Sequence, residues 1–282
     1  MHPTSRVSIH ILLHWLFIAS FVLLVLPATA YTAAAKDDYV PKVGQPGKDV
    51  VWVPNPTVMV ERLLDMAKVT PKDYVVDLGS GDGRNVIAAA KRGARAHGIE
   101  YNPDLVELSK REAKKQGVSG RVTFEVADLF KSDFSKATVV ILFLLPEMNV
   151  KLRPKLLDLK PGTRIVANTF TIGDWSADET SIVADSCEHW CTGRMWIVPA
   201  KVAGTWKLAQ GELTLNQTYQ TFSGTLKSTN GAMPVNGRLR GDQIVFSDGR
   251  TQYTGKVAGN VMEGFARTSG VDNKFRATQP RK

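Results

Sequence analysis

The segment from residue 74 to residue 84 constrains the fold of this chain more than any other part of the sequence. An apolar run with strand character, residues 74–78, leads directly into a turn with three glycines in five residues, and a helical pattern follows. Glycine is needed where the backbone takes a positive φ angle or approaches a ligand closely. A strand that ends in such a turn before a helix is typical of the ligand-binding edge of an open α/β sheet.

Strand-like and helix-like segments alternate from residue 57 onward. Hydrophobic periodicity predicts helices over residues 57–68, 85–92, 104–116 and 147–157, and strands over residues 74–78, 94–99, 121–126, 138–145 and 163–167. The segment 138–145 is apolar, as expected of a strand that is buried on both faces. With a closing pair of strands over residues 181–189 and 194–198, the pattern predicts a doubly wound, Rossmann-like α/β sheet of seven strands in a domain over residues 53–200.

The pattern changes at about residue 200, because no helical spacing follows. Short β runs are predicted over residues 212–215, 220–226, 237–239, 243–246, 251–257 and 261–266. Asp248-Gly249 and Gly259-Asn260 are typical hairpin turns. Residues 203–282 are therefore predicted to form a small all-β domain, an antiparallel barrel or a curled sheet.

Composition and charge exclude several classes of protein. The chain is 43% hydrophobic and 22% charged, which is ordinary for a globular protein and excludes a disordered or a multi-span membrane chain. Residues 201–282 hold 12 basic and five acidic residues, so they carry seven of the nine net positive charges. This excess either attracts an acidic partner or an anionic membrane surface, or is a solvated surface. No base-stacking motif or basic helix indicates specific nucleic-acid recognition.

The first 30 residues have the pattern of an export signal. Arg6 precedes an apolar run over residues 9–26, and Ala28-Thr29-Ala30 fits a cleavage site. The alternative is an uncleaved membrane anchor, because the run approaches the length that spans a bilayer. Residues 31–52 are predicted to be a tether. We therefore expect an exported or membrane-anchored protein of a bacterial cell envelope, on a side of the membrane that the few flanking charges do not decide.

Acidic residues follow three successive predicted strands. Asp77 lies in the glycine-rich segment, Glu100 ends the second strand, and Asp128 follows the third. With Asp82, Asp77 makes the turn unfavourable for a phosphate and suitable for a cationic ligand with a free amine. A carboxylate at residue 100 can accept both hydroxyls of a ribose, and one at residue 128 can accept from an adenine amine. Each acid alone could be a solvated loop residue, but three at successive strand ends indicate a binding site.

These residues give the chain a resemblance to the seven-β-strand methyltransferases that use S-adenosylmethionine, over roughly residues 53–200. The resemblance implies that Asp77 and the backbone at Gly79 and Gly81 hold the methionine part of the cofactor. It also implies that Glu100 binds the ribose and that Asp128 contacts the adenine. The neighbouring residues Ser80, Asp82 and Leu129 complete the predicted cofactor site.

A narrower resemblance rests on short segments: Val53-Pro54, Leu144-Leu145-Pro146, residues 152–156 and 160–164, and Gly173-Asp174-Trp175. They are similar to the membrane-associated protein-lysine methyltransferases of mitochondria, which act on a subunit of ATP synthase and on the adenine nucleotide translocase, and to their bacterial relatives. The resemblance implies a protein lysine as the methyl acceptor. Two features depart from the family pattern. Asn55 stands where a threonine or a similar residue is expected, and the β-rich tail is additional.

The end of the fourth strand is where the acceptor should bind. Methyltransferases that act on adenine or on amides typically have an Asn-Pro-Pro-Tyr type motif there, whereas this chain has Phe143-Leu144-Leu145-Pro146. An apolar slot beside Phe143 and Pro146 suits an aliphatic side chain, and its desolvation would lower the pKa of a lysine amine. Glu147, Asn149 and Asp174 are candidates for orienting that amine. Transfer to a small molecule or lipid at the membrane, and a non-enzymatic protein that binds S-adenosylmethionine, are the alternatives.

The chain has two cysteines, in the segment Cys187-Glu188-His189-Trp190-Cys191. With at most three ligands and no second cluster nearby, this segment is a poor metal site, and no metal is expected. A disulfide at a hairpin tip, which would suit an exported protein, and two free thiols are the other possibilities. The sequence leaves these open, together with the oligomeric state. Trp190, Trp196 and Trp206 are expected to be core or strand-packing residues.

Overall fold

The computed structural model of the protein describes residues 39–229 and 231–280. The predicted signal or anchor over residues 1–30, and the first part of the predicted tether, lie outside the described residues. Within the described part of the chain, no helix is both long and apolar enough to cross a membrane.

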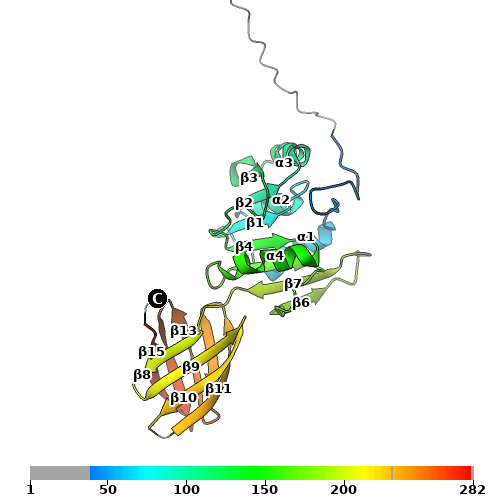
Figure 1. Ribbon diagram of the computed structural model, residues 1–282. Coiled ribbons are helices and arrows are strands. Elements are labelled where there is room, and N and C mark those ends of the chain that lie inside the picture. Colours follow the sequence, from blue (N-terminus) through cyan, green and yellow to red (C-terminus); the bar gives the residue numbers. More distant parts are fainter. Residues whose placement is uncertain (1–38, 230, 281–282) are drawn as a thin grey trace, which may run out of the picture. The chain divides into compact units, whose positions relative to one another are not determined.

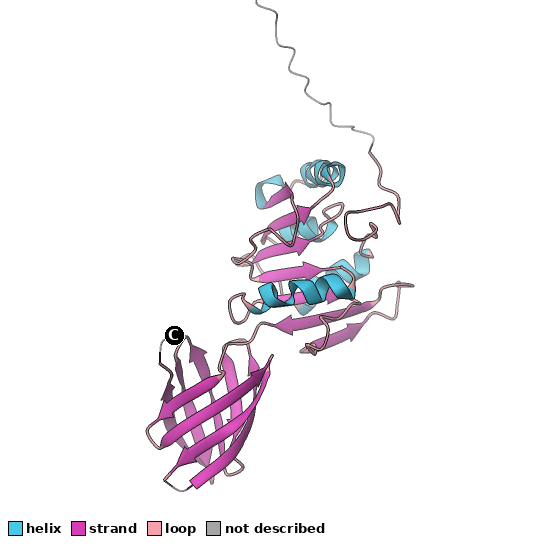
Figure 2. Cartoon of the chain, in the orientation of Figure 1, coloured by secondary structure: helices cyan, strands magenta, loops and turns pink. Residues whose placement is uncertain are grey.

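Residues 57–197 form a seven-stranded sheet with helices (Figures 1 and 2). Its elements, in chain order, are α1 (Thr57–Met66), β1 (Tyr74–Leu78), α2 (Arg84–Lys91), β2 (Arg95–Glu100), α3 (Pro103–Lys115), β3 (Val122–Val126), β4 (Val139–Leu142), α4 (Pro146–Leu157), β5 (Arg164–Asn168), β6 (Glu179–Ile182) and β7 (Thr192–Ile197). The strand order is β3-β2-β1-β4-β5-β7-β6, and β7 is antiparallel to both of its neighbours. The order reverses between β1 and β4, which places a ligand crevice at their carboxyl ends. The predicted Rossmann-like sheet is confirmed.

Alternate residues of the central strands enter two separate cores, one on each face of the sheet. Val140 and Leu142 of β4 pack with Leu152 of α4. Their neighbours Val139 and Ile141 pack on the other face, in the core that holds the apolar side chains of α1 and α2. All four residues of β4 are buried, so this short apolar strand is held from both sides, as its composition predicts.

The C-terminal part is a closed barrel of eight antiparallel strands (Figures 1 and 2). The strands are β8 (Gly204–Leu208), β9 (Gly211–Thr218), β10 (Thr221–Ser228), β11 (Gly231–Arg240), β12 (Gln243–Ser247), β13 (Thr251–Ala258), β14 (Val261–Thr268) and β15 (Val271–Thr278). Each strand pairs with the next, and β15 closes the barrel against β8 through two residue pairs, Ala277 with Leu208 and Thr278 with Lys207. Apolar side chains such as Trp206, Phe246 and Tyr253 are buried in its core. The barrel alternative is confirmed over the curled sheet.

The structure corrects the sequence prediction at three strands. The predicted strand over residues 181–189 is wrong beyond Ile182, because the chain there forms a loop in which Ser186 and Trp190 have positive φ angles of 61° and 60°. The strands β8 and β15 were not predicted. The strand β8 is only five residues long, and β15 is rich in polar and charged residues, so neither shows a long apolar alternation.

Side chains of the barrel contact the segment between β5 and β7. The ring of Tyr219 stacks on the buried ring of Trp175, with centroids 5.8 Å apart. Arg238 donates to the carboxylate of Asp178, whose side chain is 2% exposed, at 2.7 Å. The α/β part thus uses the barrel to cover one aromatic ring and to neutralise one buried acid.

Candidate functional site

The turn after β1 has a backbone that only glycine adopts without strain. Gly79 and Gly81 have φ angles of 80° and 55°. The N–H groups of Gly79 and Ser80 both donate to the carbonyl oxygen of Ile99 in β2, at 2.8 and 3.0 Å. A Cβ atom on Gly81 would lie 2.7 Å from the indole nitrogen of Trp52, so the turn also needs glycine for space.

Asp77 is the next-to-last residue of β1 and is 1% exposed. Burial raises the pKa of its carboxyl to about 8, and the charges of Glu100 and Asp82 add to the rise. A hydrogen bond from Nδ2 of Asn85, at 3.0 Å, opposes it. A cation close to this carboxyl would favour its anionic form.

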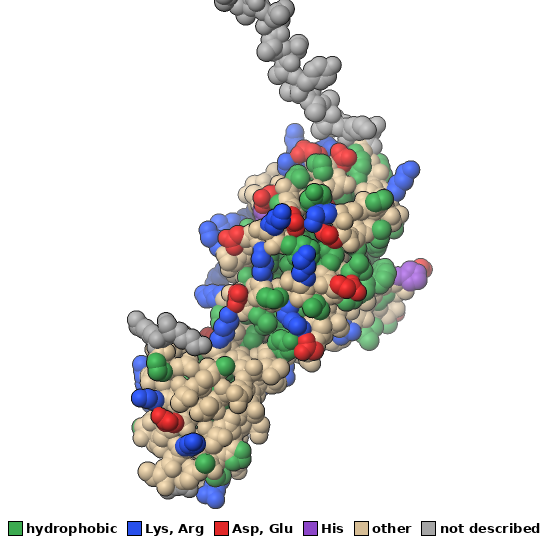
Figure 3. All heavy atoms as spheres, in the orientation of Figure 1, with side chains coloured by type: hydrophobic (Ala, Val, Ile, Leu, Met, Phe, Trp, Pro, Cys, Tyr) green, Lys and Arg blue, Asp and Glu red, His purple; other side chains and the backbone are tan. Residues whose placement is uncertain are grey.

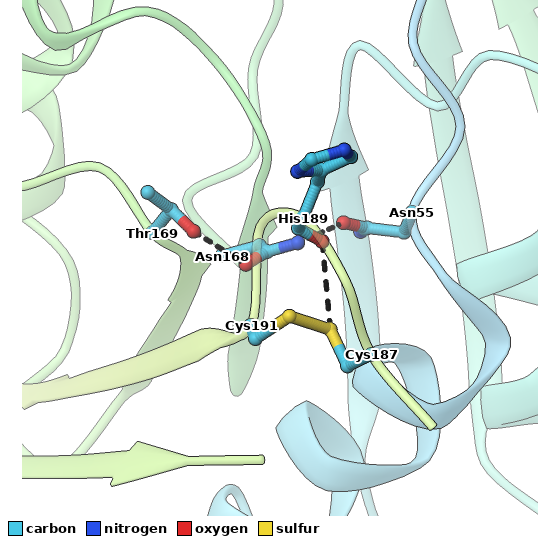
Figure 4. Close-up of a disulfide and its surroundings, with 6 residues drawn as sticks. All are labelled: Asn55, Asn168, Thr169, Cys187, His189 and Cys191. Atoms are coloured by element: carbon cyan, nitrogen blue, oxygen red, sulfur yellow. Dashed lines mark hydrogen bonds between the residues drawn. A yellow bond between two sulfur atoms is a disulfide. The ribbon is translucent and has the colours of Figure 1, made fainter. Parts of the chain in front are cut away.

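Three buried asparagines connect Asp77 to the end of β5. Nδ2 of Asn168 donates to Oδ1 of Asn55 at 2.8 Å, as Figure 4 shows. Nδ2 of Asn55 donates to Oδ1 of Asn85 at 3.2 Å, and Asn85 donates to Asp77. Every amide donates in the same direction, so the chain of hydrogen bonds is polarised toward the carboxylate. Asn55, which departs from the family pattern, is the middle member of this chain.

Five predicted site residues line one cavity at the carboxyl ends of the parallel strands: Gly79, Glu100, Asp128, Leu129 and Phe143. Glu100 accepts the backbone N–H groups of Gly81 and Asn102, both at 2.9 Å. Asp128 accepts the N–H of Phe130 at 2.9 Å, and this bond holds the pKa of its carboxyl below the ordinary value. Both carboxyls are therefore fixed by backbone donors at the rim of the cavity.

The other predicted cofactor residues do not line the cavity. Asp82 forms an ion pair with Arg84 at 2.6 Å, and Arg84 in turn donates to the carbonyl oxygen of Asn55 at 2.7 Å. The hydroxyl of Ser80 is buried and has no hydrogen-bond partner among the described residues. Asp77, Ser80 and Asp82 thus shape the turn from behind, and their contact with a cofactor stays a prediction.

Residues 45–52 of the predicted tether line the same cavity, together with Val53. The ends of this segment are joined by backbone bonds, from Gly44 to the carbonyl of Trp52 and from Trp52 to that of Gln45. Nζ of Lys48 lies 3.3 Å from Oδ2 of Asp128 and 5.4 Å from the ring centroid of Tyr101. Sequence analysis missed this wall of the site. The sequence signal for this wall is the apolar triplet at residues 51–53, because a solvent-exposed tether does not need apolar residues.

The predicted acceptor residues lie in different surroundings. Phe143 lines the cavity, whereas Pro146 and the exposed Glu147 begin α4. Asn149 is buried, and its Nδ2 donates to the carbonyl oxygens of Leu144 at 3.4 Å and of Thr171 at 3.1 Å. Its Oδ1 has no partner among the described residues.

Asp174 is engaged elsewhere in the structure. Its carboxylate pairs with Arg153 and accepts the hydroxyl of Tyr219 at 2.9 Å. These bonds hold the pKa of Asp174 below its ordinary value, with the Tyr219 hydroxyl as the first cause. A carboxylate with these partners links α4 to the barrel, and a role in orienting an amine stays a prediction.

Cys187 and Cys191 form a disulfide in the loop between β6 and β7 (Figure 4). The bond takes both cysteines of the chain, so the alternatives of two free thiols and of a metal site at these cysteines are wrong. Across residues 39–229 and 231–280, no group of three or more His, Cys, Asp or Glu side chains is placed to hold a metal ion. Trp196 and Trp206 are fully buried as expected, but Trp190 is 41% exposed, which corrects its predicted place in the core.

Fold and site together define the class. A Rossmann-like sheet with this glycine turn, and with carboxyls at three strand ends, is the cofactor-binding framework of an S-adenosylmethionine-dependent methyltransferase. The family described as ANTKMT methyltransferase domain matches residues 77–179. The chain is 43% identical over 139 residues to a protein-lysine N-methyltransferase of Saccharolobus islandicus, which covers 48% of this chain and 86% of that protein. The chain belongs to this methyltransferase family.

Two further relatives agree with this assignment. The chain is 39% identical over 131 residues to a lysine N-methyltransferase of Homo sapiens that is named for a subunit of ATP synthase, and the match covers 46% of this chain and 56% of that protein. The chain thus spans little more than half of that relative. A crystal structure described as an RNA methyltransferase from Salinibacter ruber in complex with S-adenosyl-L-homocysteine matches with a TM-score of 0.50 and 45% identity, over 53% of this chain and 96% of that chain.

The family and the solved structure with S-adenosyl-L-homocysteine confirm S-adenosylmethionine as the predicted cofactor. The residues that line the cavity also fit this molecule. Gly79 lines the cavity with backbone alone, and a Cβ there would lie 3.0 Å from the side chain of Leu144, so a larger residue does not fit. Glu100 would hold the ribose hydroxyls, and Asp128 the adenine amine. The buried carboxyl of Asp77 matches a ligand that carries an ammonium group.

Proposed function

We propose that this enzyme transfers a methyl group from S-adenosylmethionine to the side-chain amine of a lysine in another protein. One observation of the structure carries the proposal. The cavity that holds the cofactor residues is continued at the end of β4 by Phe143, Leu144 and Met148, which are apolar. This wall suits the aliphatic part of a lysine and offers no paired donor and acceptor for a base. The names of the archaeal and human relatives support the same acceptor.

In this reaction the main task of the protein is to hold the methyl donor and the acceptor amine in the correct positions. The cofactor supplies a methyl group on a positively charged sulfur, and the acceptor nitrogen displaces the sulfur in line. Apolar side chains around the amine disfavour its charged form, so they help it to lose the proton that blocks attack. Holding the two reactants in contact and in line accounts for most of the rate gain in such a reaction.

The test is a methylation reaction with a mixed extract of cell-envelope proteins, isotopically labelled cofactor and mass spectrometry of the products. Label on lysine side chains is the expected result. Its rate should still rise above neutral pH, because free lysine has a pKa of about 10.4 and burial lowers it by up to several units. Label found only on lipids or small molecules would replace the proposal with the alternative of a membrane metabolite methyltransferase.

RNA is a second candidate substrate, because the name of the Salinibacter ruber structure points to it. Total RNA belongs in the same assay as a parallel arm. The end of β4 disfavours this candidate, since the sequence Phe143 to Pro146 provides no side-chain acceptor pair for a base nitrogen. Labelled nucleotides in the absence of labelled lysine would decide for RNA.

The location of the protein is part of the proposal. We infer an exported or membrane-anchored enzyme, supported by the apolar segment over residues 9–26 and by a disulfide typical of oxidising compartments. A contact of the barrel with an anionic membrane is also proposed from its charge. On the face shown in Figure 3, however, its Lys and Arg side chains lie apart and not in one patch. A topology reporter fused after Lys282, with the mass of the mature N-terminus, tests the location.

A further inference from the structure

We propose that the rings of Phe143, Phe170 and Trp190 form a binding site for an alkylated ammonium group, and that the disulfide between Cys187 and Cys191 holds the third ring in place. The proposal rests on the proposed function, because it assigns the acceptor side of the same site. It adds the chemical class of the group that the site prefers.

The three rings lie against one another in one cluster. The ring centroids of Phe143 and Phe170 are 6.2 Å apart, those of Phe143 and Trp190 6.0 Å, and those of Phe170 and Trp190 5.4 Å. A triangle of this size has points that lie within about 6 Å of all three centroids, which is the range of a cation–π interaction. The distances therefore allow one cation to lie within this range of all three rings.

The cluster adjoins the cofactor cavity and is held there by a buried amide. Phe143 belongs both to the cluster and to the wall of the cavity. Phe143 follows β4 and Phe170 follows β5, and the side chain of Asn149 donates to a carbonyl oxygen in each of these two loops. Asn149 is thus a positioning residue for two of the rings, and a group bound to the rings lies next to the methyl donor.

The two loops that carry Phe170 and Trp190 contain strained backbone. Thr169 has a φ of 59° and Trp190 a φ of 60°, which are rare for a β-branched and for a bulky residue. Thr169 is held by a bond from its N–H to the carbonyl of Thr192 and by a bond from Arg194 to its own carbonyl. Such strain persists where the surroundings enforce it, most often at functional sites.

Trp190 is the residue that core packing does not explain. It is 41% exposed, and it lies next to Cys191 inside the segment that the disulfide closes (Figure 4 shows this loop). The partners of the bond are four positions apart, so the link restricts a very short loop. A large exposed ring in a loop this restricted is typical of a surface that is prepared for a ligand.

Ring faces attract a cation but offer it no hydrogen-bond acceptor. A primary ammonium has three N–H groups that bond to water, and these bonds are lost when the group moves onto the rings. Each methyl group replaces one N–H and so removes one of these losses. The cluster therefore favours an alkylated over an unmodified ammonium, and aromatic cages are known to select such ligands. A partly methylated acceptor should bind at least as tightly as the unmodified one.

Binding of choline and of its neutral carbon analogue, 3,3-dimethylbutan-1-ol, to the full chain tests the site without any turnover. Ligand-observed NMR titrations should give a Kd for choline at least roughly fivefold below that of the analogue. Trp190→Leu should weaken choline by about the same factor, and Trp190→Phe should restore most of the loss. Phe265→Leu, which changes an exposed ring of the barrel, is the matched control and should have no effect.

The same titrations also test whether the disulfide is needed for choline binding. Reduction with dithiothreitol can act only on this bond, because the chain has no other cysteine. It should weaken choline binding severalfold and leave cofactor affinity unchanged, and the double variant Cys187→Ser with Cys191→Ser should behave as the reduced protein does. Unchanged choline binding after reduction would overturn the role of the disulfide.

Equal affinity for choline and its analogue, or a Trp190→Leu variant that binds choline as the wild type does, would overturn the ring site. Ring-dependent binding of uridine or adenosine monophosphate in place of choline would assign the cluster to base stacking, and the ammonium site would fall. Ring-dependent choline binding with no labelled lysine in the extract would remove the proposed function and leave the site standing. Labelled lysine together with equal binding of choline and its analogue would support the proposed function and overturn the ring site.

Discussion

The side chains of Asn55 and Asn168 are joined by a hydrogen bond of 2.8 Å, although 113 positions separate them in the sequence. The bond ties the segment that leads into α1 to the end of β5, next to the loop that carries Phe170. Through Asn85 it continues to Asp77. The two sides of the site, one predicted for the cofactor and one for the acceptor, are therefore held by a single set of buried amides.

Replacing one member of this chain should cost more than the loss of one bond. Asn55→Leu leaves Nδ2 of Asn168 and Oδ1 of Asn85 without their hydrogen-bond partner, and each orphaned buried atom costs about 1–3 kcal/mol of unfolding free energy. Urea unfolding of both single variants and of the double variant Asn55→Leu with Asn168→Leu measures the coupling. The exposed Asn216→Leu is the control. Additive losses, with a coupling below about 0.5 kcal/mol, would contradict a connected chain.

Asp77 should destabilise the folded protein as pH rises. Its folded pKa is about 8 and its ordinary value 3.8, so between these values the folded state holds a proton that the unfolded state has lost. Stability therefore falls from about pH 4 to about pH 8, and the cost is complete above the folded pKa. Asp77→Asn does not titrate.

We expect Asp77→Asn to be more stable than the wild type by at least about 1 kcal/mol near pH 8.5, to show little difference near pH 4.5, and to bind the cofactor more weakly. Urea unfolding at the two pH values and calorimetry with S-adenosylmethionine measure these effects. A stability difference that is the same at both pH values would show that burial does not raise this pKa.

Glu100→Ala should weaken S-adenosylmethionine by about 1.5–3 kcal/mol, because a carboxylate that accepts ribose hydroxyls is lost. It also loses the bond to the N–H of Gly81, so the turn becomes less fixed. Titration calorimetry gives the affinity, and Glu125→Ala on the next strand is the control. An unchanged affinity in Glu100→Ala would remove the ribose assignment, and no binding by the wild type would remove the cofactor site.

A chain that ends after Val202 should still bind the cofactor, because none of the barrel residues that the structure describes lines the cavity. It should melt at a lower temperature, since the ring of Trp175 loses its cover and the carboxylate of Asp178 loses Arg238. Thermal unfolding and calorimetry on the shortened chain measure both effects. A folded but non-binding product would mean that the barrel belongs to the cofactor site.

The parts of the fold that the sequence predicts are those set by local physics. The turn at residues 79–83 needs glycine at fixed positions, and β4 is apolar because it is buried on both faces. The acids at residues 100 and 128 could be placed because parallel strands end at one edge of a sheet. Each of these features leaves a signal within a few residues of the sequence.

The parts that sequence analysis missed depend on contacts between distant residues. Nothing near Asn55 indicates that it meets Asn168, and no pattern around Trp190 indicates an exposed ring beside Phe143. Lys48 comes next to Asp128 only because the loop around it closes on the cavity. The strands β8 and β15 form by pairing with β9 and β14, over five and eight residue pairs.

The closure of the barrel has a consequence for where the molecule opens first. The β8–β15 pair is joined by two residue pairs, whereas the other neighbouring strands are paired over five to eight. Opening this seam breaks few bonds and leaves both strands free at one side, so its local free energy of opening should be the smallest in the barrel. Among the paired strands of the barrel, hydrogen exchange should therefore be fastest along the β8–β15 pair, and a protease would cut first at these two strands.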